Sequence, residues 1–199
     1  QVLVRCHLGQ GLDLGVRASH LDPNEVTDMV ERVSRHKTGD LFGLAVGGGA
    51  IAAGSTIMRE KALMTMAQEM GICLQILDDL GGVINAQRRD KGREDLLADR
   101  PTWVWAYLSR ILSRCDYMRC VRAAIDFRAG QVSEDELFLA LRGPILSRPW
   151  VSLVDKRLRA PIEALRCQGD HAVLGYLVNE LEELEHAFLG AFAKGHHHE

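Results

Sequence analysis

The stretch that decides the fold class is residues 61–95, KALMTMAQEMGICLQILDDLGGVINAQRRDKGRED. Its large apolar residues recur at intervals of three and four: Leu63, Met66, Met70, Leu74 and Leu77. This spacing is typical of an amphipathic helix, because it lines up apolar side chains along one face. The first part of the stretch therefore predicts a helix with one buried stripe.

Three polar residues, Gln75, Asp78 and Asp79, lie near the end of this predicted helix. Gln75 precedes the two aspartates by three and four residues, which places all three on one side of the last turns. Two close carboxylates repel each other, and one takes up a proton unless a cation lies between them. Mg²⁺ binds carboxylate oxygens and usually keeps waters and substrate phosphates as its other ligands.

The segment that follows, RRDKGR at residues 88–93, is a basic loop that would suit an anionic group beside such a metal ion. A helix that ends in water, with exposed aspartates and a solvated charged loop, fits the same residues. On these residues alone, both interpretations stay open.

Composition restricts the class of protein. The chain has 199 residues, of which 47% are hydrophobic and 26% charged, as in an ordinary globular protein. We expect one α-helical domain over residues 1–194, and a remnant of a purification tag in GHHHE at 195–199. The net charge of −3 predicts no nucleic-acid partner. Five cysteines without a CxxC pair indicate a reducing compartment, so we expect a cytoplasmic protein.

The first half of the chain shows further helix signals. Asp22 and Glu25 form a capping-box pattern around Pro23, which predicts a helix start. Gly39 allows a break or kink. The next segment, residues 41–54, is apolar nearly all round and rich in Gly and Ala. It is too short to span a bilayer comfortably, so we predict a helix buried against close neighbours and no transmembrane segment.

The second half continues the helical pattern. Its boundaries are marked by Pro101, by the capping pair Ser133 and Glu136, by Gly143-Pro144, which we expect to break the chain, and by Asp170, a candidate cap of the last helix. Aromatic side chains after Pro101 are expected in the core: Trp103, Trp105 and Tyr107. No sustained alternation at period two occurs, so we predict an all-α domain of eight or nine helices.

Four stretches, in this order, resemble the C-terminal half of the trans-isoprenyl diphosphate synthases, also called polyprenyl synthetases. They are GQGLDL (9–14), HKTGDLFGLAVGGGAIAAG (36–54), GICLQILDDLGG (71–82) and DKGREDLLADRPTW (90–103). Matching order and spacing make the set far more specific than any single stretch. The resemblance covers residues 1 to 110.

The resemblance implies an isoprenoid synthase-like helical bundle around a central cavity, where two aspartate-rich motifs hold Mg²⁺ on an allylic diphosphate. The implied reaction is condensation of that diphosphate with isopentenyl diphosphate. The resemblance assigns Mg²⁺ binding to Asp78 and Asp79, contact with the allylic diphosphate to Lys37, support of the same group to Gln75 and Lys91, and lining of the cavity to Thr38 and Gln10.

Two departures from the family pattern stand out. The second motif usually ends in a third aspartate, and Gly82 occupies that position. The first motif belongs upstream of Gln10, where the sequence has no room for it. We therefore expect half an active site, completed in a homodimer or by a chain that brings the first motif.

Two alternative functions follow from the same residues. One is a terpene cyclase on the same fold, although its metal motif would need ligands at positions 82 and 86, which are Gly82 and Ala86. The other is a non-catalytic regulatory subunit of a prenyl diphosphate synthase.

Overall fold

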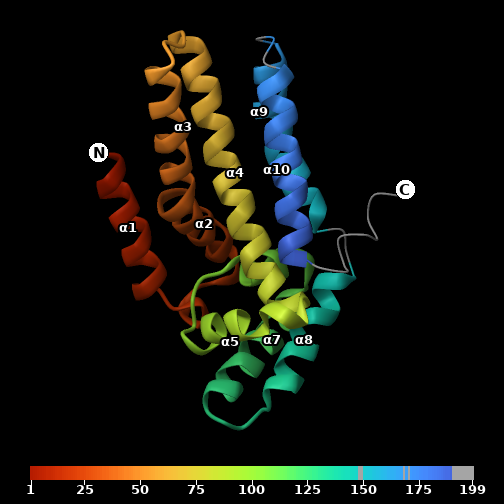
Figure 1. Cartoon of the computed structure of the whole chain (residues 1–199). Coiled ribbons are helices and arrows are strands. Elements are labelled where there is room, and N and C mark those ends of the chain that lie inside the picture. The colour runs from red at the N-terminus through yellow and green to blue at the C-terminus, as the bar shows by residue number, and fades with distance from the viewer. Residues whose placement is uncertain (148–149, 168, 170, 190–199) are drawn as a thin grey trace.

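The computed structural model describes residues 1–147, 150–167, 169 and 171–189 (Figure 1). Within these residues the chain forms ten α-helices and no strand, which confirms the all-α prediction. The helices are α1 Val2–Gly15, α2 Pro23–Ser34, α3 Asp40–Ala52, α4 Ile57–Ile84, α5 Arg89–Leu97, α6 Trp103–Ile111, α7 Arg114–Arg128, α8 Glu134–Leu146, α9 Val151–Arg166 and α10 His171–Leu189. No helix in this described part is long and apolar enough to cross a bilayer.

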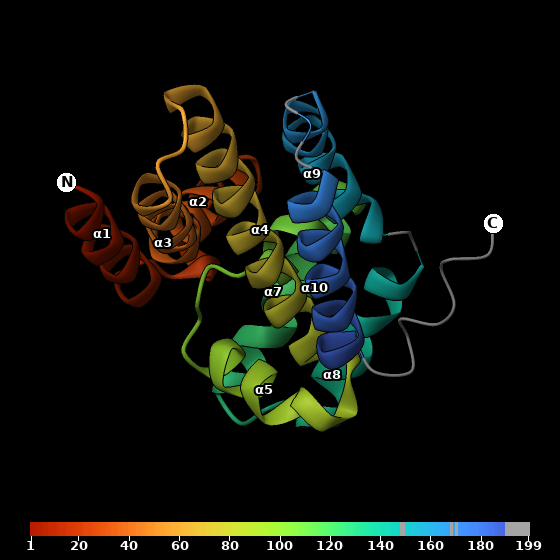
Figure 2. The same ribbon diagram turned by 45° about the horizontal axis from the view of Figure 1, so that its top comes forward.

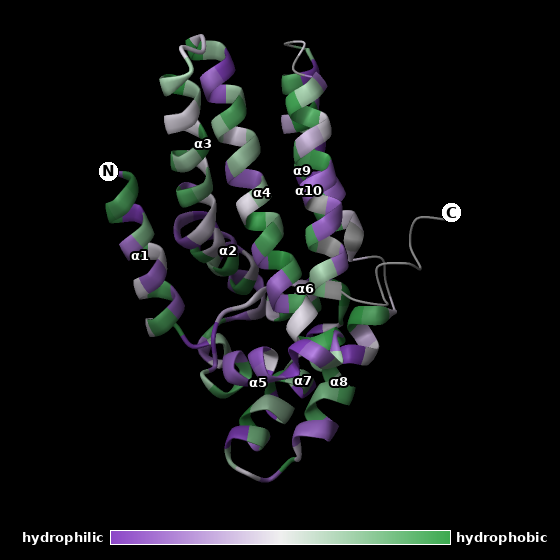
Figure 3. Ribbon diagram, in the orientation of Figure 1, coloured by the Kyte–Doolittle hydropathy of each residue, from purple (hydrophilic) through white to green (hydrophobic). Residues whose placement is uncertain are grey.

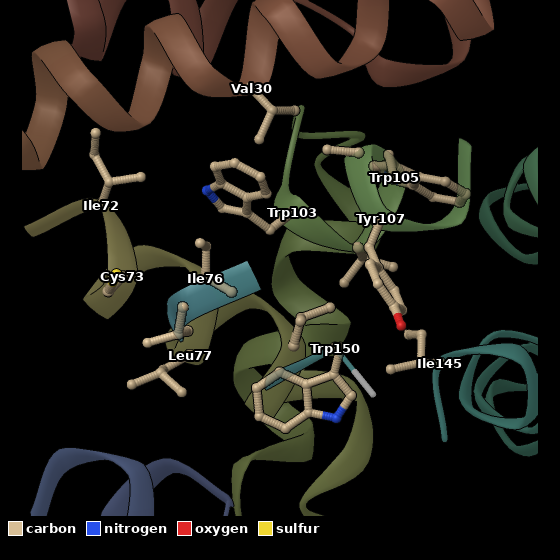
Figure 4. Packing of buried hydrophobic residues seen from close by; sticks show 14 of the residues in the cluster. Val30, Ile72, Cys73, Ile76, Leu77, Trp103, Trp105, Tyr107, Ile145 and Trp150 are labelled. Atoms are coloured by element: carbon tan, nitrogen blue, oxygen red, sulfur yellow. The ribbon is translucent and has the colours of Figure 1, made fainter. Parts of the chain in front are cut away.

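The long helix α4 is the centre of the bundle. It contacts α3 on one side and α9 and α10 on the other, while α5 and α8 pack near its C-terminal end (Figures 1 and 2). Its buried residues Ile72, Ile76 and Leu77 are fully covered. Figure 4 shows them facing Trp103 and Trp150. Burial of each such side chain contributes about 1.5–3 kcal/mol to folding. The predicted apolar stripe is buried except at Leu74, which is half-buried, and the core of α4 is wider than the stripe.

The predicted start of α2 is present, and Gly39, where the sequence allows a break or kink, ends a π-helical turn. The Asp22 side chain accepts a hydrogen bond from Asn24 N, and the Glu25 side chain accepts one from Asp22 N, which completes the capping box. Helix α2 then passes into α3 through one π-helical turn, Arg35–Gly39. A Cβ atom at Gly39 would lie 3.0 Å from the Gln68 carbonyl oxygen, so the turn packs directly on α4.

Helix α3 only partly follows the prediction. Its Gly43 and Gly47 do let it pack closely on α4, since a Cβ at either position would lie 2.7 Å from a side-chain atom of Gln68 or Met64. The opposite face is exposed and apolar, with Leu41, Leu44 and Ile51 at 45%, 42% and 62% exposure. Figure 3 shows α3 coloured white to green along most of its length. The predicted burial against close neighbours therefore holds for the face on α4 and is wrong for this face.

The second half confirms the core aromatics and the second capping box. Trp103, Trp105 and Tyr107 are 1%, 2% and 4% exposed. The Ser133 hydroxyl accepts a hydrogen bond from Glu136 N, and the Glu136 side chain accepts one from Ser133 N. These elements formed as expected because their signals are local in the sequence.

Two boundary predictions are wrong. The segment expected to be a basic loop forms the helix α5, supported by the Lys91–Asp95 pair four residues apart, and this raises the helix count above eight or nine. The expected break at Gly143-Pro144 does not occur, because α8 continues to Leu146 and ends two residues after the proline. The predicted cap Asp170 and the predicted tag remnant lie outside the described residues.

Candidate active site

A narrow cleft lies where α1, the π-helical turn, the end of α4, α5 and the segment before α6 meet. Its charged and amide side chains come from α1, the π-helical turn, α4 and α5: Asp13, Lys37, Gln75, Asp79, Lys91 and Asp95. The cavity volume is only about 10 Å³. Acidic and basic side chains therefore contact one another across the cleft and enclose little free space.

Asp79 is a buried acid of the cleft. Its Oδ1 accepts a hydrogen bond from Gln75 Nε2 at 2.8 Å, and its Oδ2 accepts one from the Trp103 backbone N–H at 2.7 Å. Burial raises the pKa of Asp79 to about 7, although the two hydrogen bonds favour the charged form. Gln75 in turn accepts a hydrogen bond from the Thr38 hydroxyl at 3.1 Å. Gln75 and Asp79 therefore lie on one side of α4, as predicted, but the prediction is wrong for Asp78, which pairs with Arg88 instead.

Lys37 extends from the π-helical turn toward α1. Its Nζ lies 2.8 Å from Asp13 Oδ2, and the Asp13 side chain is only 6% exposed. Gly9 makes this contact possible, because a Cβ there would lie 2.5 Å from the Lys37 backbone nitrogen. The absence of a side chain at Gly9 thus lets α1 cross directly over the turn and bring a carboxylate to Lys37.

Lys91 reaches the cleft from α5. Its Nζ lies 2.8 and 2.7 Å from the two carboxylate oxygens of Asp95, and Arg100 Nη1 lies 3.1 Å from the same group. Burial opposes the charge on Lys91, but hydrogen bonding and attraction to Asp95 outweigh it, with smaller contributions from Asp78 and Asp79. The pKa of Lys91 is therefore held above its usual value.

Asp78 lies beside this cleft and does not line it. Its carboxylate forms an ion pair with Arg88, whose guanidinium lies 4.0 Å from the centre of the Phe188 ring. Successive residues of an α-helix are about 100° apart around the axis. Asp78 and Asp79 consequently have different partners, and the described residues contain no group of three or more His, Cys, Asp or Glu side chains that could hold a metal ion. Mg²⁺ binding at this pair stays a prediction.

The remaining predicted residues divide between the cleft and the surface. Thr38 does not line the cleft itself but donates a hydrogen bond to Gln75, which does. Gln10 is exposed on α1, one turn before Asp13, and does not line the cleft. Sequence reasoning missed Asp13 and Asp95 as site residues. The spacing of Lys91 and Asp95 was an available signal, because oppositely charged residues four apart on a helix pair readily.

Comparison with known proteins agrees with this geometry. A family model described as polyprenyl synthetase matches residues 1–126. Farnesyl diphosphate synthase of Escherichia coli strain K12 is 36% identical over 77 residues, which are 38% of this chain and 24% of that enzyme. The chain thus matches about a quarter of this relative's length, and no solved structure matches it significantly. The family match extends over more than half of the chain, so the protein belongs to the polyprenyl synthetase family.

Proposed function

We propose that this chain forms one half of the active site of a Mg²⁺-dependent prenyltransferase, which condenses an allylic diphosphate with isopentenyl diphosphate. The observation that carries the proposal is the convergence of Lys37, Gln75, Asp79 and Lys91 on one cleft. They belong to three of the stretches that resemble the family and lie up to 54 positions apart in the sequence. Their convergence is not a consequence of local structure.

The oxygen atoms of this site suit Mg²⁺. Each Asp79 oxygen accepts one hydrogen bond, which leaves a second lone-pair direction on each. Asp78 lies in the same turn and would bind the metal after release from Arg88. A Mg²⁺ ion on these carboxylates would neutralise charge on the diphosphate as it leaves the allylic group.

The cationic side chains would bind the diphosphate itself. Lys37 and Lys91 are now paired with Asp13 and Asp95. We propose that a diphosphate exchanges these ion pairs for contacts with its own oxygens and opens the cleft. The two lysines would then stabilise the negative charge that develops during ionisation. The buried apolar residues of α4 would keep water from the allylic cation.

The facing carboxylates of the first aspartate-rich motif would come from a segment outside residues 1–199, or from a partner subunit. Helices α1 and α3 contact each other, and both expose large apolar side chains: Leu3, Val4, Leu8, Leu14, Leu41, Leu44 and Ile51. Exposed apolar residues in such numbers favour association with another protein surface. We propose that the completing segment packs on these two helices.

Calorimetry with a non-hydrolysable allylic thiodiphosphate tests the proposal. We expect the chain to bind this analogue with Mg²⁺ and to lose binding with EDTA. The Asp78→Asn, Asp79→Asn double variant should weaken Mg²⁺-dependent binding more than tenfold, a loss of about 1.4 kcal/mol. A matched control is Asp28→Asn, Asp155→Asn, since both aspartates are exposed on helices away from the cleft. Equal binding by the two double variants would remove the site assignment.

A regulatory role without catalysis is favoured by one observation. The position of the third aspartate, Gly82, packs against the backbone of α5 and has no room for a carboxylate. In that case the same chain would bind the diphosphate and change the rate of a partner synthase. Two assays distinguish these roles. Turnover that appears only when this chain is added to an inactive partner chain indicates catalysis. A changed rate of a synthase that is already active without this chain indicates regulation.

A further inference from the structure

A second cleft, apart from the candidate active site, opens between α4, α6 and α9. Its volume is about 290 Å³, close to the lower limit of about 300 Å³ for small-molecule pockets. Its apolar wall is formed by Ile76, Trp103 and Leu153, of which the first two are almost completely buried. Figure 4 shows Trp103 between Val30 and Ile76. This wall would accept an apolar group of limited size.

The rim of this cleft has an excess of positive charge. Arg157 is paired with Glu31 and Glu69, and Arg35 is paired with the same two glutamates, so these four charges balance. Lys156 and Arg110 also line the cleft and are exposed.

In the part of the chain that the structure describes, neither Lys156 nor Arg110 makes a hydrogen bond or an ion pair, unlike the cations of the candidate active site. The rim therefore carries two positive charges that no acidic group of the described residues neutralises. Since charge-assisted hydrogen bonds to oxyanions are among the stronger polar contacts, two such cations beside an apolar wall favour an anion.

We propose that this cleft is a second binding site, for a small anion that carries a short apolar group, such as a phosphate monoester or a carboxylate. Arg110 and Lys156 bind the anionic group, and the apolar part lies against Leu153, above the floor that Trp103 and Ile76 form. The guanidinium of Arg157, 5.6 Å from the centre of the Trp103 ring, remains held by its glutamates.

Trp103 connects this cleft with the candidate active site. Its backbone N–H donates to Asp79, and its indole Nε1 donates to the Ser34 hydroxyl at 2.8 Å. Asp79 and Ser34 both line the active-site cleft. A ligand in this cleft therefore lies next to the residue that positions Asp79. The proposal itself concerns binding and does not depend on the proposed enzymatic activity.

The test is calorimetric titration with hexyl phosphate in EDTA, so that no divalent cation brings the phosphate to the active-site cleft. We expect a Kd at or below about 1 mM for the unmodified chain. Hexanoate should bind too, because the proposed site accepts a carboxylate as well as a phosphate. Hexanol, which has no charge, and inorganic phosphate, which has no apolar part, should each bind at least tenfold more weakly.

The decisive variant is Arg110→Gln, Lys156→Gln, which should weaken hexyl phosphate binding at least tenfold while the thermal unfolding transition is unchanged. Its matched control, Arg32→Gln, Lys61→Gln, removes an exposed arginine and an exposed lysine outside the cleft and should bind normally. Lys37→Gln should also bind normally, which separates this cleft from the active site. Undetectable binding to the unmodified chain, or equal affinity in the two double variants, would overturn the proposal. Binding lost only in Lys37→Gln would do the same and assign the anion to the active-site cleft.

Discussion

Gly82 of α4 and Gly92 of α5 contact each other backbone to backbone. A Cβ atom at Gly92 would lie 2.2 Å from the Gly82 carbonyl oxygen, and one at Gly82 would lie 3.0 Å from Gly92 Cα. This close approach places α5 against the end of α4 and brings Lys91 and Asp95 to the cleft. The resemblance assigns the position of a third aspartate to Gly82, and the packing of α5 leaves no room for a side chain there.

The first prediction concerns this contact. Gly92→Ala should lower the free energy of unfolding by about 1–3 kcal/mol, as overpacking of a close contact does. Gly48→Ala is the control, because Gly48 is also inside a helix and nothing lies within 4 Å of its Cβ position. That change should be neutral or stabilising by up to about 1 kcal/mol. Urea denaturation measures both, and equal stability of the two variants would contradict the contact.

Placing an aspartate at position 82, as in the family motif, tests the contact between Gly82 and Gly92 in a second way. Gly82→Asp should destabilise the chain and should not strengthen Mg²⁺-dependent binding of the allylic analogue, because the new side chain must displace α5 and with it Lys91. Urea denaturation and calorimetry on one sample give both quantities. A stable variant with tighter Mg²⁺-dependent binding would show that the position is open to a ligand.

Lys37 is predicted to bind the diphosphate. Lys37→Ala should weaken binding of the allylic analogue more than tenfold, about 1.4 kcal/mol. The change also leaves the buried Asp13 carboxylate unpaired, which costs stability. The double variant Lys37→Ala, Asp13→Asn should therefore regain stability and still bind weakly. An effect of Lys37→Ala within twofold, like that expected for the exposed Lys61→Ala, would indicate a residue with no role in binding.

Asp79 should make stability depend on pH. Burial raises the pKa of Asp79 from its ordinary 3.8 to about 7 in the folded chain. The folded carboxyl therefore keeps its proton over a pH range where the unfolded one has lost it. Its contribution to stability is complete below pH 4 and is lost as the pH rises through 7.

Asp79→Asn, which is neutral throughout, should remove this dependence. Between pH 4 and 8 the unmodified chain should lose up to about 4 kcal/mol relative to Asp79→Asn. Denaturation curves at several pH values measure the difference, and Asp28→Asn, at an exposed position, should show no such trend. A constant difference between the chain and Asp79→Asn at every pH would contradict a raised pKa at this site.

The isolated chain is predicted to be catalytically silent. Among the described residues we propose one pair of carboxylates, Asp78 and Asp79, as metal ligands, so charge on the leaving group would be poorly neutralised. Purified residues 1–199 should give no prenyl transfer with an allylic diphosphate, isopentenyl diphosphate and Mg²⁺. Ordinary enzymatic turnover by the isolated chain would refute the proposal that it forms only half of the active site.

The local features of this protein were predictable from sequence because each depends on residues within four positions of one another. The capping boxes at Asp22 and Ser133 formed as predicted, and Gln75 and Asp79 lie on one side of α4 as their spacing indicated. The order of four short stretches was sufficient to indicate the family, and the family match over residues 1–126 confirmed it.

The tertiary structure alone decided which charges meet. Lys37 and Asp13 are 24 positions apart, and their contact depends on how closely α1 crosses the π-helical turn at Gly9. The different partners of Asp78 and Asp79 follow from the direction in which α5, α6 and α10 approach α4. The sequence shows that apolar side chains line all sides of α3, and it therefore indicated a buried helix. Exposure depends on which neighbouring helices cover each side, and only the tertiary structure shows that.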